Sequence, residues 1–259
     1  MASIIPRARD RKRPLLPIRD INPTAIRPFI TWGLIALCTA IFFLVQPQEV
    51  DDGNRFIYRH AAIACEITTG VPLDLDEIRT GICREDSGGT MVFPDKSIWQ
   101  SILNSIFLHG SIAHLLFNMW SLWIFGNNVE EAFGHVGYLV FFVATGIAAT
   151  IGFVVLNPAL TIPLVGASGA IAGVMGAYVV LFPTHRVLTL ILFRVVAIRS
   201  VWFLGIWFFS QFLMAGEESS IAWEAHVAGF LAGAIIALPF REALLARTLE
   251  GAGRRYDYA

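Results

Sequence analysis

The sequence has few charged residues for its length. Asp, Glu, Lys and Arg together make up 15% of the 259 residues, whereas soluble domains average about a quarter. Hydrophobic residues make up 56%, and the mean hydropathy is +0.63. This composition argues against a soluble domain with a large core and predicts a polytopic membrane protein. The net charge of -1 says nothing about partners, and because no feature of the sequence suggests nucleic-acid binding, we expect no nucleic-acid partner.

Cysteine is also scarce, and the N-terminus lacks the apolar core of a signal peptide. The basic segment "MASIIPRARDRKRPLLPIRD" is interrupted by prolines and is not followed directly by an apolar run, so we interpret it as a disordered or interfacial cytosolic arm. Of the three cysteines, Cys38 lies in an apolar run and is expected to pack there. Cys65 and Cys83 lie in a polar segment, where a disulfide requires a location outside the cytosol; their pairing stays open.

Long apolar segments are what the sequence does have. A membrane-spanning helix needs about 20 predominantly apolar residues. Six segments reach or approach this length: 28–45, 112–125, 137–156, 168–182, 200–214 and 224–239. Residues 187–198 either lie in the membrane interface or extend the fifth span. We therefore predict an all-α membrane protein, a bundle of six transmembrane helices over residues 28–240, with an N-terminal arm at 1–27 and a tail at 241–259.

The positions of Lys and Arg predict the orientation of this bundle. They gather in the arm and in the tail, and Arg186, Arg194 and Arg199 lie between the fourth and fifth spans. Because positive charge marks cytoplasmic loops, both termini are expected in the cytosol, which requires an even number of spans. Acidic residues outnumber basic ones in loop 46–100, so we interpret it as an external, partly structured insert. We expect a multi-pass protein of a bacterial inner membrane.

Four polar side chains share one depth in this arrangement. Spans two, four and six all run from outside to inside. His114 and Asn118 lie in the first turns of span two, Ser168 opens span four, and His226 lies near the start of span six. Polar residues inside a membrane are costly and usually face the bundle interior or a water-filled cavity. This shared depth is the strongest physical signal in the sequence.

Ser168 and His226 each allow a structural and a catalytic interpretation. In "VGASGAIAG", Ser168 is either an N-cap and small packing residue or a nucleophile beside free helix N–H groups, which suit a developing oxyanion. His226 is either a hydrogen-bonded core residue or the base that a serine needs within about 3 Å. Gly229 and Gly233 are spaced to bring span six close to a neighbour such as the glycine-rich span four.

Two further histidines and one asparagine extend the candidate site. His114 and Asn118 are four residues apart and so share a helix face, and both can donate hydrogen bonds to an oxyanion. The alternative is a polar network that holds helices together. His109 is expected at or before the helix start, where it orients the loop.

Metal chemistry is the alternative for these histidines. His109, His114 and His226 are possible ligands, but their spacing is not H-E-x-x-H, and no carboxylate lies between His109 and His114. We rank metal binding below serine catalysis and expect neither a metal nor another cofactor.

With these residues assembled, the chain resembles the rhomboid family of intramembrane serine proteases over roughly residues 99–240. The resemblance rests on "HGSIAHLLFN", "GASG" and "AHVAGFLAG", in this order and with this spacing. It implies the six-helix fold, Ser168 as nucleophile and His226 as general base and later acid. It also implies an oxyanion hole made by His114, Asn118 and the Ser168 backbone N–H, with His109, Gly166 and Gly169 in support.

The resemblance further implies substrates and marks two departures. Members of the family cut transmembrane segments of other membrane proteins, so transmembrane substrates and the lipid bilayer are the implied partners. Glu130 and Gly134 match a pattern that ties the end of span two to the following loop. Trp99 is followed by Gln100 rather than by arginine, and the insert after the first span is long, which leaves the structure of the first external loop open.

Two other function classes compete with a protease. A catalytically inactive rhomboid-like protein would bind membrane proteins and direct their trafficking, but it would be expected to lack the serine or the histidine. A small transporter would be expected to have inverted repeats or interrupted helices, and the sequence has no internal repeat. The oligomeric state stays open.

Overall fold

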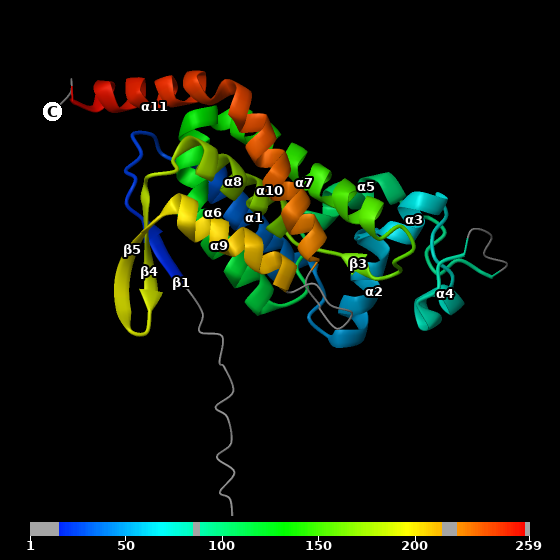
Figure 1. The fold of residues 1–259 in the computed structure, drawn as a ribbon. Helices are drawn as coiled ribbons and strands as arrows, with labels where there is room; N and C mark the ends of the chain where they lie inside the picture. Colours follow the sequence, from blue (N-terminus) through cyan, green and yellow to red (C-terminus); the bar gives the residue numbers. More distant parts are fainter. Residues whose placement is uncertain (1–15, 85–88, 214–221, 257–259) are drawn as a thin grey trace, which may run out of the picture.

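The computed structural model describes residues 16–84, 89–213 and 222–256. The fold is mostly helical, and its core is one bundle (Figure 1). The bundle contains α1 (Phe29–Ala40, continued by the π-helical turn Ile41–Val45), α6 (Ile112–Phe133), α7 (His135–Leu156), α8 (Ser168–Leu181), α9 (Ser200–Leu213) and α10 (Trp223–Ala237).

Helix α8 lies at the centre of this bundle. It contacts α6, α7, α9 and α10, and nearly all of its residues are buried. Its small residues permit this packing because they let helix backbones approach closely. A side chain at Gly173 would overlap Thr145 of α7, and one at Gly176 would overlap the Phe230 carbonyl of α10. Across the same interface, side chains at Gly229 and Gly233 would overlap backbone atoms of α8.

The C-terminal end of α6 anchors the starts of two other helices. The fully buried carboxylate of Glu130 accepts hydrogen bonds from the N–H groups of Ile30 (2.9 Å) and Thr31 (2.8 Å), which are unpaired donors in the first turn of α1. The same carboxylate lies 2.6 Å from His135 Nδ1 in the first turn of α7. Gly134 supports the sharp turn between α6 and α7 with a φ of 72°. Glu130 therefore ties α6 to the following helix and also to α1.

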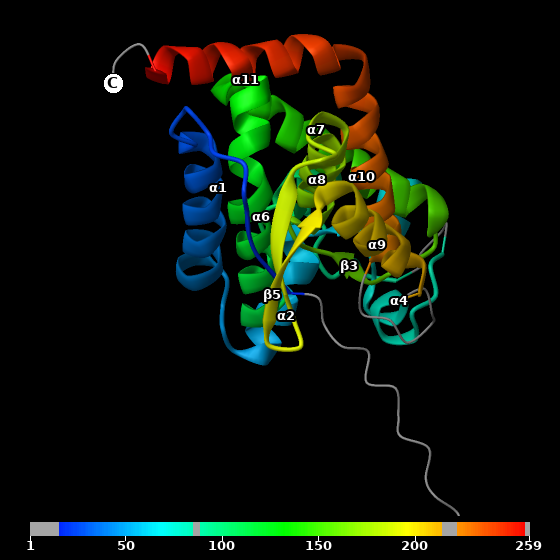
Figure 2. The same cartoon turned by 60° about the vertical axis from the view of Figure 1, so that its left-hand side comes forward.

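Helix α11 (Arg241–Tyr256) follows the short 3-10 helix Leu238–Phe240 and crosses the end of the bundle (Figures 1 and 2). Arg247 donates a hydrogen bond to the Phe133 carbonyl at 2.7 Å, and Arg241 donates to the Val180 carbonyl at 2.9 Å. Both carbonyls lie at helix ends, where acceptors lack intrahelical partners. The tail is therefore fixed to the ends of α6 and α8.

A three-stranded antiparallel sheet corrects the prediction of an all-α protein. Strand β1 (Leu16–Asp20) pairs with β4 (Arg186–Ile191), and β4 pairs with β5 (Arg194–Arg199). Residues 187–198 therefore form most of a hairpin, and the end of the predicted disordered or interfacial arm is an ordered strand. The β-branched residues of "RVLTLI" and "RVVAIR", with alternate burial in β4, explain why strands win over a helix here.

This sheet lies along the flank of the bundle. Strand β1 contacts α6, whereas β4 and β5 contact α9 (Figure 2). The indole N–H of Trp120 donates to the Pro17 carbonyl at 2.8 Å. Asp20 accepts hydrogen bonds from Asn128 of α6 (2.5 Å) and Tyr178 of α8 (2.9 Å). The N-terminal segment is thus attached to the bundle mainly by polar side chains.

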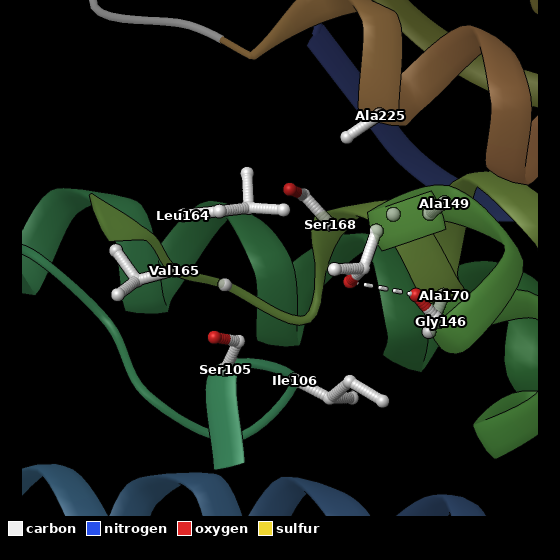
Figure 3. Close-up of a pocket in the computed structure, with 12 residues that line it drawn as sticks. Ser105, Ile106, Gly146, Ala149, Leu164, Val165, Ser168, Ala170 and Ala225 are labelled. Carbon is white, nitrogen blue, oxygen red and sulfur yellow. Dashed lines mark hydrogen bonds between the residues drawn. The ribbon is translucent and has the colours of Figure 1, made fainter. Parts of the chain in front are cut away.

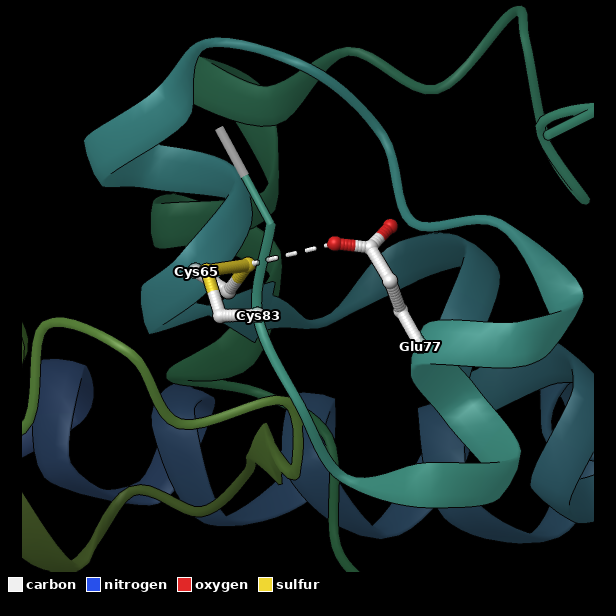
Figure 4. Close-up of side chains that lie close together, drawn as sticks. All are labelled: Cys65, Glu77 and Cys83. Carbon is white, nitrogen blue, oxygen red and sulfur yellow. Dashed lines mark hydrogen bonds between the residues drawn. A yellow bond between two sulfur atoms is a disulfide. The ribbon is translucent and has the colours of Figure 1, made fainter. Parts of the chain in front are cut away.

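The segment between α1 and α6 forms a compact, partly structured insert. It contains α2 (Val50–His60), β2 (Ala62–Ile63), α3 (Ala64–Thr69) and α4 (Leu75–Thr80), and α5 (Ile98–Ser105) follows it. A disulfide joins Cys65 to Cys83, which answers the question that the sequence left open (Figure 4). A buried ion pair between Lys96 and Glu66 (2.5 Å) closes the insert, and the Lys96 ammonium also donates to the Tyr58 carbonyl (2.7 Å).

The helices only partly match the predicted spans. Within the described residues, two helices are long and apolar enough to cross a membrane, 135–156 and 223–249, and three shorter apolar helices cover 29–45, 168–181 and 200–213. Helix α6 begins at Ile112 as predicted but continues to Phe133. The predicted end of the fifth span at Met214 lies outside the described residues.

Candidate functional site

Ser168 is the first residue of α8. The N-cap is Ala167, and no side chain caps this helix, so the interpretation of Ser168 as the N-cap is wrong. The hydroxyl of Ser168 lies between Leu164 and Ala225 of α10 (Figure 3). A small cavity of about 20 Å³ lies beside it, which is room for about one water molecule.

The loop before Ser168 packs against the first turns of α6. Gly166 has a φ of 124°, and its N–H donates to the Ser105 carbonyl at 2.9 Å. A Cβ at position 166 would lie 2.7 Å from two ring atoms of His114 and 3.5 Å from Asn118 Nδ2. Only glycine fits both this backbone conformation and this space. Gly166 thereby lets the loop before Ser168 pack closely against His114 and Asn118.

The insert supports the same loop from its other side. Strand β3 (Pro163–Leu164) pairs with β2 in antiparallel register. Cys65 N donates to the Leu160 carbonyl at 3.0 Å, and Thr68 Oγ1 donates to the Pro158 carbonyl at 2.8 Å. The loop that lines the approach to Ser168 is therefore held by the disulfide-linked insert.

His226 lies in the first turn of α10, beside the glycine contacts between α8 and α10. A side chain at Gly169 would overlap Ala149 of α7 and lie 3.7 Å from the Ala225 carbonyl. The Nδ1 atom of His226 lies 2.8 Å from Gln211 Oε1 of α9, and its ring centroid lies 6.0 Å from that of Trp207. His226 is thus fixed by α8 through the helix backbone and by α9 through side chains.

A cavity of about 1050 Å³ brings together the four polar residues that the sequence singled out. Its lining includes His114 and Asn118 from α6, Ser168 from α8 and His226 from α10. Asn118 is 6% exposed, and its Nδ2 atom has no hydrogen-bond partner in the described part of the chain. A buried donor without a partner is costly, so this amide is available to bond a water molecule or a ligand in the cavity.

His109 lies before the N-cap of α6, as predicted. Its backbone N–H and carbonyl both bond the side chain of Gln46, each at 3.0 Å. Its ring meets the His114 ring edge-to-face, with centroids 5.3 Å apart at 67°. His109 therefore lies behind His114 and connects the start of α6 to the segment after α1.

Sequence reasoning missed Gln211, the residue in contact with His226. The signal was a single amide in the apolar run "FLGIWFFSQF", because polar residues within such runs are costly and usually functional. Glu224, two residues before His226, also lines the large cavity.

The described residues give little support to metal binding. The ring nitrogens of His109, His114 and His226 do not form a group within 4.8 Å of one another. Among the described residues, the group that meets this distance is Cys65, Glu77 and Cys83 in the insert (Figure 4). The two sulfurs are bonded to each other there, so they have no thiolate to offer a metal.

Comparisons with known proteins match the part of the chain that contains this cavity. Rhomboid protease GluP of Bacillus subtilis is 33% identical over 141 residues, which cover 54% of this chain and 27% of the relative. Putative rhomboid protease YdcA of the same organism is 32% identical over 148 residues, covering 53% and 65%. Rhomboid protein 1, mitochondrial, of Saccharomyces cerevisiae is 31% identical over 162 residues, covering 60% and 46%.

The alignments thus span less than two thirds of the length of each of these relatives. The family model of the rhomboid domain matches residues 95–243 of the chain. This range is more than half of the chain and includes every residue of the candidate site. This match shows that the chain belongs to the rhomboid family.

Proposed function

We propose that the protein is an intramembrane serine endopeptidase that hydrolyses peptide bonds in or near transmembrane segments of other membrane proteins. The observation that carries the proposal is the convergence of Ser168, His226, His114 and Asn118, from three helices, on one cavity. In this proposal the six bundle helices span the membrane, both termini face the cytosol, and the insert lies outside. The disulfide in the insert supports that orientation, because disulfides persist in oxidising compartments.

Ser168 and His226 supply the nucleophile and the base. A serine hydroxyl is a weak nucleophile until a neighbouring base removes its proton during the attack. His226 takes that proton as Ser168 attacks the scissile carbonyl, and then gives it to the leaving amine. Water completes the cycle by hydrolysing the acyl-enzyme, with His226 again acting as base.

The oxyanion of the tetrahedral intermediate lies between α6 and α8. The unpartnered amide of Asn118 and the ring of His114 are donors on one side. The first N–H groups of α8 have no intrahelical partner, so the backbone N–H of Ser168 can supply a donor on the other side. Donors that are already in position stabilise charge as it develops in the transition state.

The walls of the cavity fit an extended, apolar segment. The cavity lining includes Phe117 of α6, Trp207 of α9 and the loop from Asn157 to Val165. A helical substrate must unwind locally before attack because its backbone hydrogen bonds shield the scissile carbonyl. Transmembrane segments with small or helix-destabilising residues are therefore the expected substrates.

Cleavage of a reporter transmembrane substrate by the full chain, reconstituted in lipid vesicles, tests the proposal. Ser168→Ala and His226→Ala should each abolish cleavage while the protein remains folded. Ser97→Ala is the matched control, because Ser97 is exposed before α5 and makes no side-chain cap bond there. Full activity of either the Ser168 or the His226 variant contradicts the assignment.

The same assay separates a protease from an inactive member of the family. If the wild-type protein binds the reporter in the vesicles but never cleaves it, the protein is a binding factor and the catalytic proposal fails. The presence of both Ser168 and His226 at the cavity favours the enzyme.

A further inference from the structure

We propose that Gln211 of α9 is a positioning residue that fixes the tautomer and the ring orientation of His226. This inference rests on the proposed function. It turns the serine–histidine pair into a three-residue arrangement whose third member is a neutral amide on a different helix.

The hydrogen bonds of Gln211 determine which end of its amide faces His226. Its Nε2 atom donates to the Trp207 carbonyl at 3.0 Å and lies 3.4 Å from Ser210 Oγ. The Oε1 atom is the end that lies 2.8 Å from His226 Nδ1. An amide flip would place Nε2 against the imidazole and Oε1 against a carbonyl oxygen, leaving two acceptors face to face. The observed orientation is therefore the one that satisfies the network.

This orientation decides where the histidine carries its proton. The Oε1 atom can only accept, so the neutral imidazole must donate from Nδ1. The other nitrogen, Nε2, is then unprotonated and free to take a proton. The bond made by one ring nitrogen sets the state of the other, and a base for Ser168 needs this tautomer.

The burial of Gln211 indicates that its hydrogen bond with His226 is not incidental. Gln211 is 3% exposed, in a helix of otherwise mainly apolar residues. A buried amide costs free energy unless its donor and acceptor are both used. The network uses both, with Trp207 on one side and His226 on the other. A leucine or methionine would fill this space without the polar cost, so the amide has a role beyond packing.

The contact also makes the base depend on the position of α9. Trp207 and Gln211 are four residues apart and so share one helix face, and both contact the ring of His226. A displacement of α9 away from α10 removes both contacts together. The tautomer required for catalysis is therefore favoured only while α9 is packed against α10.

Kinetics of three variants in reconstituted vesicles test the inference. Gln211→Leu should lower kcat at least about tenfold, since loss of the group that holds a catalytic histidine in its correct tautomer costs this much or more, while KM changes less than twofold. Gln211→Glu retains an acceptor for Nδ1 and should recover most of kcat. Its acid limb should move to higher pH, because a carboxylate favours the protonated imidazole. Gln100→Leu makes the same substitution at an exposed position of α5 and should match the wild type.

A spectroscopic measurement keeps the inference testable if a variant does not fold. Nitrogen NMR of histidine-labelled wild-type protein above neutral pH should report the Nδ1–H tautomer for His226, assigned with His226→Ala. An Nε2–H tautomer overturns the inference, as does a folded Gln211→Leu variant with wild-type kcat and pH profile. Ser168→Ala is measured in parallel to separate failure of the Gln211 inference from failure of the proposed function. If the proposed function is wrong, the wild-type protein and Ser168→Ala will show the same cleavage.

Discussion

The two neighbours of α10 hold it in different ways. Against α8, the contact is between backbones: Gly229 faces Gly169, and Gly233 faces Gly173, with no room for a side chain. Against α9, the contact runs through long side chains, in which Trp207 and Phe208 approach Phe230 and Gln211 reaches His226. Backbone contacts between small residues leave little freedom for adjustment, whereas side-chain contacts can open and close.

This difference separates two tasks of the candidate site. The α8–α10 contact sets the distance between the positions of Ser168 and His226, because both residues lie in the first turns of helices that meet at glycines. The α9 contact sets the orientation of the imidazole within that frame. Changes to the first contact should therefore damage the fold, and changes to the second should alter catalysis in a folded protein.

The largest effect is expected from a side chain in the backbone contact. Gly229→Val adds atoms where even a Cβ overlaps the Gly169 carbonyl, so α10 must move away from α8. Overpacking of this kind costs about 1–3 kcal/mol or more, and cleavage should be lost together with a clear fall in Tm. Gly205→Ala is the matched control on α9, because nothing lies within 4 Å of an added Cβ there. A wild-type Tm for Gly229→Val would contradict the claim that the backbone contact between α8 and α10 has no room for a side chain.

The next largest effect is expected at the oxyanion donors on α6. Asn118→Ala removes the unpartnered amide and should lower kcat on the order of a hundredfold, with His114→Ala giving a further partial loss by the same reasoning. Unlike Gly229→Val, these variants should keep the wild-type Tm, because they delete a polar group from the wall of an open cavity. Full activity of both variants would contradict the proposal that Asn118 and His114 stabilise the oxyanion.

A smaller effect is expected from the disulfide of the insert. A closed loop of about this length contributes on the order of 3 kcal/mol, so Cys65→Ser combined with Cys83→Ser should lower the Tm of the insert. The insert holds the loop before Ser168 through backbone hydrogen bonds, so cleavage should fall only a few-fold. A reductant should affect the wild type and leave the double variant unchanged; an equal effect on both would show that the disulfide is not responsible.

The smallest expected effect is a pH dependence of the stability of the folded protein, caused by Asp20 in the N-terminal strand. Burial raises the pKa of Asp20 to about 6 from 3.8, although hydrogen bonds from Tyr178 and Asn128 and the charge of Arg19 oppose the shift. Because the folded-state pKa is raised, the folded protein binds this proton more tightly, and the associated stability is lost as pH rises through about 6. The loss between pH 5 and pH 8 amounts to about 1 kcal/mol.

Asp20→Asn tests that prediction, since asparagine retains an acceptor and cannot ionise. The Tm of the wild type should fall more than that of Asp20→Asn between pH 5 and pH 8, measured by thermal unfolding in detergent. A parallel fall in both proteins would show that another group is responsible for the pH dependence.

The proximity of four candidate residues could be predicted from the sequence, because a helix that spans a membrane would fix the depth of its residues. The predicted direction of the spans implied that His114, Asn118, Ser168 and His226 lie near one another, and all four line one cavity. The contact of Gln211 with His226 could not be predicted, because it depends on how α9 is rotated and on which end of its amide faces the ring.

The sheet and the internal structure of the insert escaped prediction for a different physical reason. In a chain this apolar, β-branched runs such as "RVLTLI" are hard to distinguish from parts of a helix. Pairing of β1 with β4 joins residues that are far apart in the sequence, and no local pattern specifies it. The disulfide likewise depends on where α3 and the segment after α4 meet.

Labelling with a serine-reactive fluorophosphonate tests the central claim most directly. Membranes that contain the wild-type protein should show covalent labelling, and mass spectrometry should map the adduct to Ser168. Labelling should disappear in Ser168→Ala and fall strongly in His226→Ala, whereas Ser97→Ala should label like the wild type. Labelling that persists in Ser168→Ala, or a folded wild-type protein that is never labelled, would contradict the assignment of Ser168 as a nucleophile activated by His226.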